Sequence, residues 1–445
     1  MILNKNVNQK ALYEFVQKFK KIGHLQQMGI IHRGEEILKF SIKPYEITDS
    51  KQLFSISKTF TSMAIGLAIE EGKIGLHDKV IDYFRGMPLE KVSPYLEKME
   101  IYHLLNMTTG HNECVMYKIG PTPNPIKAFL ELHIQYEPGT HFAYNTAASL
   151  MLAAIHKIAT GMDLDEYLKP MLEALEIKDY YFEKIGGLCL GGVGTHVNID
   201  ALLNFGSMLL NKGMFKGKQV VPAKYVEMAT TKQIDSIFNG TPDWTCGYGL
   251  HLWMGQEGFR CDGAFGQLII CLPDRQMVIA VQSHVYTMQE EVDFVMEFVN
   301  QLYETSVVED LENKINEIYK IEKTTPFEQE CKFIVEPNIL KIDEIHIIPN
   351  ANSITIEFNG DNTFKLEAGN GKYCKSRFWA SSVKKKLDGM MPFMYEESIV
   401  SSYYKYEQNV LDIVMKNHNT PLIQNIVIDV DRKVVNINNF ELKLK

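Results

Sequence analysis

The chain has 445 residues, of which 45% are hydrophobic and 23% are charged, and its formal net charge at pH 7 is -9. This composition is typical of a globular protein, and the length favours two domains over one. An excess of negative charge gives no electrostatic basis for binding nucleic acid or an anionic membrane, so neither is expected as a partner. No apolar run reaches membrane-spanning length.

The N-terminal segment and the cysteines both favour a cytoplasmic location. Close to the start of the chain, apolar residues recur at helical spacing, which is typical of an amphipathic helix rather than a signal peptide: Leu12, Phe15, Val16 and Phe19. The 7 cysteines are scattered and odd in number, without the paired short spacing of zinc ligands. We therefore expect a reducing compartment, with neither disulfides nor a metal. No motif in the sequence indicates a cofactor.

The first predicted elements are a hairpin and a long helix. Residues 28–32 and 36–40 are strand-like runs on either side of a turn at Arg33-Gly34-Glu35. From Phe54 onward, apolar residues recur every three or four positions until Gly72, which predicts a helix with one buried face. A mainly helical region continues to about residue 232.

Strand patterns then return at residues 247–253, 267–272 and 277–282, before a closing helix around residues 292–299. A hairpin, helices, strands and a final helix suit a sheet that is assembled from both ends of the domain around a helical insertion. We therefore predict that residues 1–305 form an α/β (α+β) domain with an antiparallel sheet flanked by helices.

The last part of the chain is predicted to form a second, smaller domain. A polar stretch predicts a linker at residues 306–329, and short strand patterns follow over residues 330–445. Turn residues such as Asn359-Gly360-Asp361 and Asn370-Gly371 separate these strands. Their alternation favours a small antiparallel barrel or sandwich.

Ser55 and Lys58 form a pattern that is typical of a serine nucleophile with a lysine base. A serine hydroxyl is a weak nucleophile until a neighbouring base removes its proton, and helical spacing places these two side chains on one face. Burial lowers the pKa of a lysine and allows it to act as that base. The pattern recurs at Ser381/Lys384, Ser382/Lys385 and Ser402/Lys405, but only Ser55 opens a long apolar helix.

Further motifs follow this pair in a fixed order, and together they resemble the class C β-lactamase and penicillin-binding-protein-like serine hydrolase family. The resemblance extends from about residue 8 to about residue 303. It rests on the following segments: Phe54 to Ser62, Glu71 to Val80, His103 to Leu105 with Thr108 to Gly110, Pro138 to Asn145, Gly191 to Gly194 and Gly263 to Gln267. The implied fold is β-lactamase/transpeptidase-like, with a helical subdomain.

The resemblance implies roles for individual residues. Ser55 would be the nucleophile, Lys58 its proton-handling partner, and Tyr144 both the second candidate base and the proton donor to the leaving group. Either Lys58 or Tyr144 takes the first proton, and the sequence leaves both open. The backbone N–H groups of Ser55 and Gln267 would form the oxyanion hole.

Two motifs depart from the family pattern. The second reads Tyr144-Asn145-Thr146, so the usual asparagine of Tyr-x-Asn falls on Thr146 or has moved to Asn145. The third reads Ala264-Phe265-Gly266, without the lysine or histidine that binds a substrate carboxylate, unless Arg260 or His251 substitutes. The candidate substrate-binding residues are therefore Asn145, Thr146, Ala264, Phe265, Gly266 and Arg260.

We accordingly expect a serine hydrolase that acts through an acyl-enzyme on a small ester, amide or D-amino-acid peptide. Two alternatives remain open. One is a binding or regulatory protein that has lost catalysis on the same scaffold, as the missing cation suggests. The other is a true β-lactamase or DD-peptidase. The sequence assigns no role to the C-terminal domain and no oligomeric state.

Overall fold

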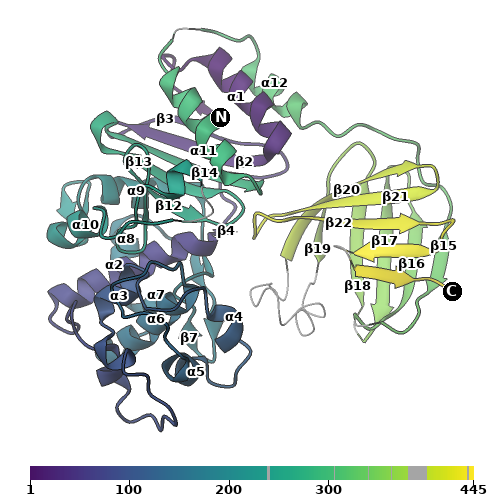
Figure 1. Cartoon of the computed structure of the whole chain (residues 1–445). Coiled ribbons are helices and arrows are strands. Elements are labelled where there is room, and N and C mark those ends of the chain that lie inside the picture. Colours follow the sequence, from purple (N-terminus) through teal and green to yellow (C-terminus); the bar gives the residue numbers. More distant parts are fainter. Residues whose placement is uncertain (238–240, 305, 339, 362, 379–397, 438–439) are drawn as a thin grey trace. The chain divides into compact units, whose positions relative to one another are not determined.

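The computed structural model describes residues 1–445 except 238–240, 305, 339, 362, 379–397 and 438–439 (Figure 1). The described chain divides into two compact units. The first comprises Met1–Ser41 with Ile47–Leu311, and the second Ile42–Glu46 with Glu312–Lys445. Helix α12 (Leu311–Ile318) lies within the segment predicted as a linker. Among the described residues, no helix has the length and apolar character needed to cross a membrane.

A seven-stranded antiparallel sheet forms the centre of the first unit, in the order β1-β3-β2-β14-β13-β12-β11. The prediction of a sheet built from both ends of the unit is confirmed, because β2 from the N-terminal hairpin pairs with β14 along its whole length. The strands are β1 (Ile2–Leu3), β2 (Gly23–His32), β3 (Glu35–Ser41), β11 (Trp253–Met254), β12 (Phe259–Gly263), β13 (Gln267–Leu272) and β14 (Met277–Val285).

Helices cover the two faces of this sheet (Figure 1). On one face, α1 (Gln9–Ile22) packs against α11 (Met288–Asn300), with the rings of Phe15 and Phe298 stacked 5.4 Å apart. On the other face lies α9 (Ile199–Leu210), whose Leu203 comes so close to Gly29 of β2 that a Cβ there would lie 2.6 Å from it. The sheet is therefore buried on both faces, as its apolar strands require.

A helical subdomain follows the long apolar helix predicted from Phe54. This helix is α2 (Ser57–Glu70), and it packs against α6 (Thr146–Thr160) at the centre of the subdomain. Nearly all of α2 is buried, its polar residues included, so the prediction of a single buried face was too narrow. The surrounding helices are α3 (Ile101–Leu105), α4 (Met116–Ile119), α5 (Pro125–Glu131), α7 (Leu164–Tyr167), α8 (Lys169–Ala174) and α10 (Ala223–Ala229).

The strand predicted at residues 247–253 is wrong for most of its length, because β11 begins only at Trp253. Gly247 and His251 adopt left-handed φ values of 121° and 67°, which interrupt an extended run. Strand β12 was not predicted from the sequence, for a different reason. It carries two buried charges, Arg260 and Asp262, which pair with one another and conceal the apolar alternation.

The second unit contains a ten-stranded sheet that curls into a half-barrel, which confirms the predicted antiparallel β-rich fold. A bridge between Val335 and Leu444 joins the ends of the curled sheet and so protects its edge strands. A dense apolar core fills the inside. The strands are β15 (Cys331–Ile334), β16 (Ile342–Pro349), β17 (Ser353–Gly360), β18 (Phe364–Gly369), β19 (Cys374–Phe378), β20 (Ser398–Glu407), β21 (Val410–Asn417), β22 (Ile423–Asp429), β23 (Val434–Ile437) and β24 (Phe440–Lys443).

Candidate active site

Ser55 occupies a short 3-10 turn, η1 (Phe54–Ile56), that runs directly into α2. Within the segment from residue 51 to residue 66, Ser55 alone is partly exposed and every other residue is buried. Pairing of β4 (Lys51–Gln52) with β8 (Thr195–Val197) anchors the chain just before the turn. The fold therefore presents one hydroxyl group to solvent at the start of a buried helix.

The Lys58 ammonium group lies one helical turn further along, and its Nζ donates to Ser55 Oγ over 2.9 Å. The same nitrogen donates to the carbonyl oxygen of Gly192 over 2.8 Å and lies 5.0 Å from the ring centroid of Tyr144. Lys58 is only 1% exposed, and burial lowers its pKa from 10.5 to about 7. A large fraction of the lysine is therefore neutral at physiological pH and able to accept a proton from Ser55.

Tyr144 precedes α6 and faces the same hydroxyl group. Its side chain forms a hydrogen bond with that of Ser55, and its ring stacks on Trp253 with centroids 5.3 Å apart. Desolvation raises the pKa of Tyr144 well above its usual value, with only a partial offset from the Ser55 hydrogen bond. The phenol consequently keeps its proton at neutral pH, which favours a role as a proton donor.

The glycine-containing loop before β8 completes the surroundings of Lys58. The Gly192 carbonyl group accepts a hydrogen bond from Lys58, so this loop passes directly beside the candidate base. Gly191 has a φ of 67°, and a Cβ there would lie 2.4 Å from the carbonyl oxygen of Ser149 in α6. A Cβ on Gly192 would lie 2.8 Å from the Thr146 side chain. Only glycine permits this approach.

The turn between β12 and β13 lies against η1. A Cβ on Gly263 would lie 2.0 Å from the carbonyl oxygen of Leu53, so the two backbones are in direct contact. Phe54 and Phe265 have left-handed φ values of 48° and 65°, and their rings meet edge to face at 5.1 Å. Strained non-glycine residues of this kind gather at functional sites. Here they flank the peptide groups of Ser55 and Gln267, which the sequence predicts to form the oxyanion hole.

The two residues of the second motif have different environments. Asn145 is fully buried, and its Oδ1 accepts hydrogen bonds from the backbone N–H groups of Ala147 at 3.1 Å and Val115 at 3.2 Å. It therefore caps α6, a role that favours structure over the predicted substrate contact. Thr146 is partly exposed, and its side chain lies next to Gly192, whose carbonyl group contacts Lys58.

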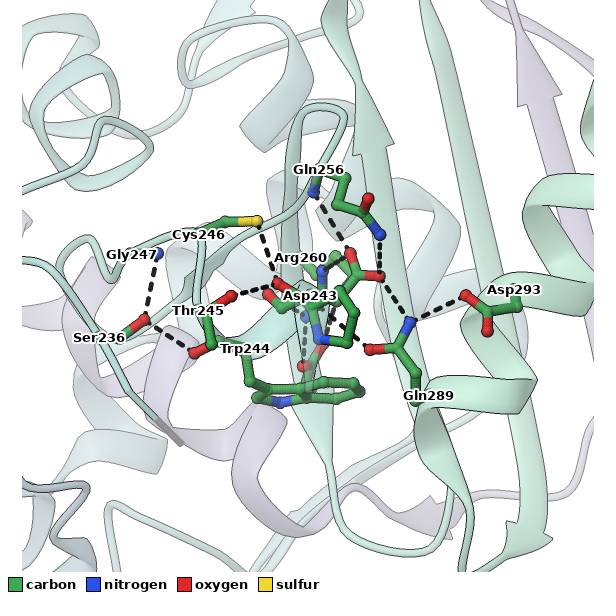
Figure 2. Close-up of polar contacts among 12 residues, drawn as sticks. Ser236, Asp243, Trp244, Thr245, Cys246, Gly247, Gln256, Arg260, Gln289 and Asp293 are labelled. Atoms are coloured by element: carbon green, nitrogen blue, oxygen red, sulfur yellow. Dashed lines mark hydrogen bonds and ion pairs between the residues drawn. The ribbon is translucent and has the colours of Figure 1, made fainter. Parts of the chain in front are cut away.

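The predicted substitutes for the missing cation both have partners inside the fold. Arg260 is 1% exposed, and its guanidinium group contacts Asp243 at 2.8 Å and Asp262 at 3.2 Å, above the Trp244 ring (Figure 2). His251 bonds to Ser149 and to the Leu105 carbonyl group through its two ring nitrogens. Burial lowers its pKa to about 3, so the imidazole is neutral. These environments favour structural roles for both residues.

Neutral aromatic rings surround the third motif in place of a cation. Ala264 is exposed and Phe265 partly so. The Phe265 ring stacks on His284 at 5.8 Å and meets the exposed Tyr286 edge to face at 5.6 Å. Because burial lowers the pKa of His284, this imidazole also stays neutral at pH 7. Neither His284 nor Tyr286 could be recognised from the sequence, since they lie on β14 and just after it, about twenty residues from the motif.

One group of potential metal ligands occurs in the described part of the chain, formed by Asp163, Asp165 and Cys189. Lys184 Nζ lies 2.8 Å from Asp165 and 3.6 Å from Asp163, and Lys157 also contacts Asp163. Both carboxylates therefore already have lysine partners.

Comparison with known proteins identifies the class to which this fold and site belong. A sequence model of the beta-lactamase family matches residues 27–294, which is more than half of the chain. The chain therefore belongs to the beta-lactamase family, whose members are generally hydrolases, and its first unit has the β-lactamase/transpeptidase-like fold.

Individual relatives are distant. An uncharacterized protein of Alkalihalophilus pseudofirmus is 24% identical over 208 residues, which are 42% of this chain and 55% of that protein, so the match spans about half of the relative's length. The octameric penicillin-binding protein homologue of Pyrococcus abyssi aligns with a TM-score of 0.53 and 16% identity over 98% of this chain and 99% of its own. A class C beta-lactamase mutant aligns with a TM-score of 0.53 and 14% identity over 66% of this chain and 97% of its own. These structural similarities are similarities of fold.

Proposed function

We propose that this protein is a serine hydrolase that transfers the acyl group of a small, uncharged ester or amide to Ser55 and then to water. The observation that carries the proposal is the Lys58–Ser55 contact of 2.9 Å, in which a buried lysine with a pKa lowered to about 7 meets the one partly exposed hydroxyl group between residues 51 and 66. A lysine that is partly neutral near pH 7 has the basicity that general-base catalysis needs.

In the proposed first step, Ser55 Oγ attacks the acyl carbonyl carbon while neutral Lys58 takes the hydroxyl proton. The N–H groups of Ser55 and Gln267 stabilise the oxyanion of the tetrahedral intermediate, an interaction worth about 3 kcal/mol for each donor. Tyr144, whose raised pKa keeps it protonated, gives its proton to the leaving alkoxide or amine. Lys58 then returns the Ser55 proton to Tyr144, over whose ring its Nζ lies at 5.0 Å.

Water completes the proposed cycle by attacking the acyl-enzyme. Neutral Lys58 takes one proton of the water molecule and returns it to Ser55 Oγ as the tetrahedral intermediate collapses, which releases the carboxylic acid and restores the Ser55 hydroxyl group. The atoms balance with water as the sole co-substrate, so the proposed reaction needs no metal or cofactor.

The substrate class follows from the surroundings of the third motif. A substrate carboxylate needs a charge-assisted partner, whereas the side chains here are the aromatic rings of Phe265 and Tyr286 and the His284 imidazole, whose pKa is lowered by burial. Such a surface favours an apolar acyl or leaving group. Esters and amides are therefore favoured over the carboxylate-bearing β-lactams and cell-wall peptides on which a true β-lactamase or DD-peptidase would act.

A fluorophosphonate probe tests the nucleophile directly. At pH 8, where Lys58 is mostly neutral, we expect the purified full chain to be labelled in one peptide, with the phosphonate on Ser55 as located by peptide mass spectrometry. Failure to label at any pH from 6 to 9 would reject the proposal in favour of a scaffold that has lost catalysis. Turnover of p-nitrophenyl esters and amides by the same preparation gives a second, independent readout.

Restoring a cation at the third motif tests the substrate class. Ala264→Lys is expected to raise kcat/KM for the carboxylate-bearing β-lactam nitrocefin by about tenfold to a hundredfold, the value of one charge-assisted hydrogen bond. Ala264→Met, of similar length but uncharged, is the matched control and is expected to give no gain. Equal nitrocefin turnover by the wild type and both variants would contradict the role given to this position.

We also propose a reducing cellular compartment. All 7 cysteines are free. Free thiols in this number support a cytosolic location, since secreted proteins generally pair them.

A further inference from the structure

Behind the third motif lies a buried polar contact that the proposed mechanism does not use. It joins Ser283, near the end of β14, to Glu291 in the first turns of α11, and both residues are 0% exposed. Ser283 Oγ lies 2.8 Å from Glu291 Oε1 and 3.0 Å from the carbonyl oxygen of Gly266. A buried carboxyl group is costly unless it has a specific environment, so its position beside the motif calls for an explanation.

The fold brings this pair into contact with the backbone of Gly266. The pairing register of β14 with β2 shifts between Gln282 and Ser283, and such a bulge redirects the side chain that follows it. Gly266 has a φ of 85°, and a Cβ there would lie 2.0 Å from Ser283 Oγ and 2.5 Å from Glu291 Oε2. Glycine at this position thus leaves room for both polar groups directly against the peptide chain.

The carbonyl group of Gly266 and the N–H group of Gln267 belong to the same planar peptide unit. A hydrogen bond to the carbonyl oxygen therefore fixes the direction in which the N–H group points on the opposite edge of the unit. Ser283 supplies this bond over 3.0 Å. The Gln267 side chain supports the same turn, because its Nε2 donates to the carbonyl oxygens of Ser283 at 2.9 Å and Phe265 at 3.2 Å.

Counting protons explains the presence of a carboxyl group. The Ser283 hydroxyl group has one proton, and three acceptors compete for it: Glu291 Oε1 at 2.8 Å, the Gly266 carbonyl oxygen at 3.0 Å and, more distantly, the Phe265 carbonyl oxygen at 3.3 Å. A protonated Glu291 donates to Ser283 Oγ and leaves the Ser283 proton for Gly266. An ionised Glu291 would take that proton, and the carbonyl group would lose its partner.

The protonated form prevails at neutral pH. Burial raises the pKa of Glu291 to about 8, against the opposing effect of the hydrogen bond from Ser283 on β14 and with a smaller upward contribution from the negative charge of Asp262 on β12. No positive charge contributes among the causes of this shift.

We propose that Ser283 and Glu291 are positioning residues, which hold the Gly266–Gln267 peptide unit so that the Gln267 N–H group faces the oxyanion. This inference rests on the proposed function, in which that N–H group stabilises the tetrahedral intermediate. Glu291 acts through Ser283, and neither residue touches the substrate.

Ser283→Ala removes the bond to the carbonyl oxygen and is expected to lower kcat for a p-nitrophenyl ester about tenfold to a hundredfold, somewhat less than deletion of an oxyanion donor. KM should change little, because the bond acts on the transition state. Ser283→Thr keeps the hydroxyl group and is expected to retain most of kcat. The thermal unfolding midpoint of each variant separates loss of positioning from loss of fold.

The dependence of kcat on pH distinguishes a positioning role from a purely structural one, because a purely structural contact would not change it. Wild-type kcat is expected to decline above about pH 8 as Glu291 ionises, and Glu291→Gln, which donates to Ser283 but cannot ionise, is expected to abolish that decline. A Ser283→Ala kcat within about twofold of the wild-type value, or an alkaline decline that persists in Glu291→Gln, would overturn the inference. Either result leaves Ser55 labelling intact, whereas loss of wild-type labelling would overturn the proposed function itself.

Discussion

Ser55→Ala is expected to lower kcat for ester hydrolysis by on the order of 10⁴-fold or more, because removing the nucleophile prevents formation of the acyl-enzyme. Steady-state turnover of a p-nitrophenyl ester measures the loss, and fluorophosphonate labelling should disappear together with it. The effect on stability should be small, since Ser55 is the one partly exposed residue in its segment and its removal leaves no cavity.

Ser402→Ala is the matched control for this change. Ser402 also stands three residues before a lysine, but it lies in β20, where residues three apart point to opposite faces of the sheet. Ser402 is also 0% exposed, in contrast to Ser55. Its replacement is expected to leave ester turnover and labelling unchanged. Equal losses in the two variants would contradict the assignment of the nucleophile. The other two matches, at Ser381 and Ser382, lie outside the described residues.

The nucleophile and its base were accessible to sequence analysis because the interactions that define them are local. Ser55 and Lys58 are one helical turn apart, and the recurrence of apolar residues along the helix after them predicts that this helix is packed into the protein. Strands β13 and β14 were likewise predictable, since each is a continuous apolar run bounded by turn residues.

The remainder of the site depends on contacts between distant segments. Trp253 stacks on Tyr144 from more than a hundred residues away, and no local pattern indicates such a contact. Glu291 has the appearance of a surface residue in an amphipathic helix, yet the bulge in β14 and the absence of a side chain at Gly266 enclose it. Asn145 did carry a local signal, because an asparagine directly before a helix is a typical N-cap.

The relative pKa values of Lys58 and Tyr144 favour one order of proton transfers over the other. The sequence left both residues open as the first base. Burial moves the two pKa values in opposite directions, down to about 7 for the lysine and above its usual value for the tyrosine. Since the deprotonated lysine is abundant at neutral pH and the phenolate is scarce, Lys58 is the favoured base in the proposed mechanism and Tyr144 the favoured acid.

Lys58→Met is expected to lower kcat by about 10³-fold, within the range typical for loss of a general base. In the wild type, kcat should rise with pH through about 7 as Lys58 loses its proton, and this ascending limb should be absent from the residual activity of the variant. The measurement is a pH series of p-nitrophenyl ester turnover from pH 5 to pH 8. An unchanged ascending limb in Lys58→Met would assign the titrating base to another residue.

Stability provides the control, because the same burial that activates Lys58 opposes folding. Its pKa is about 7 in the folded protein and 10.5 when unperturbed, so between these values the unfolded chain binds more protons and the free energy of unfolding rises with pH. Below about pH 7 this contribution is constant and unfavourable. Lys58→Met removes it, whereas the second buried lysine with a pKa near 7, Lys51, contributes equally to both proteins. Urea unfolding of the variant should therefore show a smaller increase in stability from pH 7 to pH 10 than the wild type. Loss of activity together with a smaller change in the free energy of unfolding with pH would identify Lys58 as a base whose burial destabilises the folded protein. If the variant instead kept the wild-type pH dependence of stability, Lys58 would be charged in the folded protein.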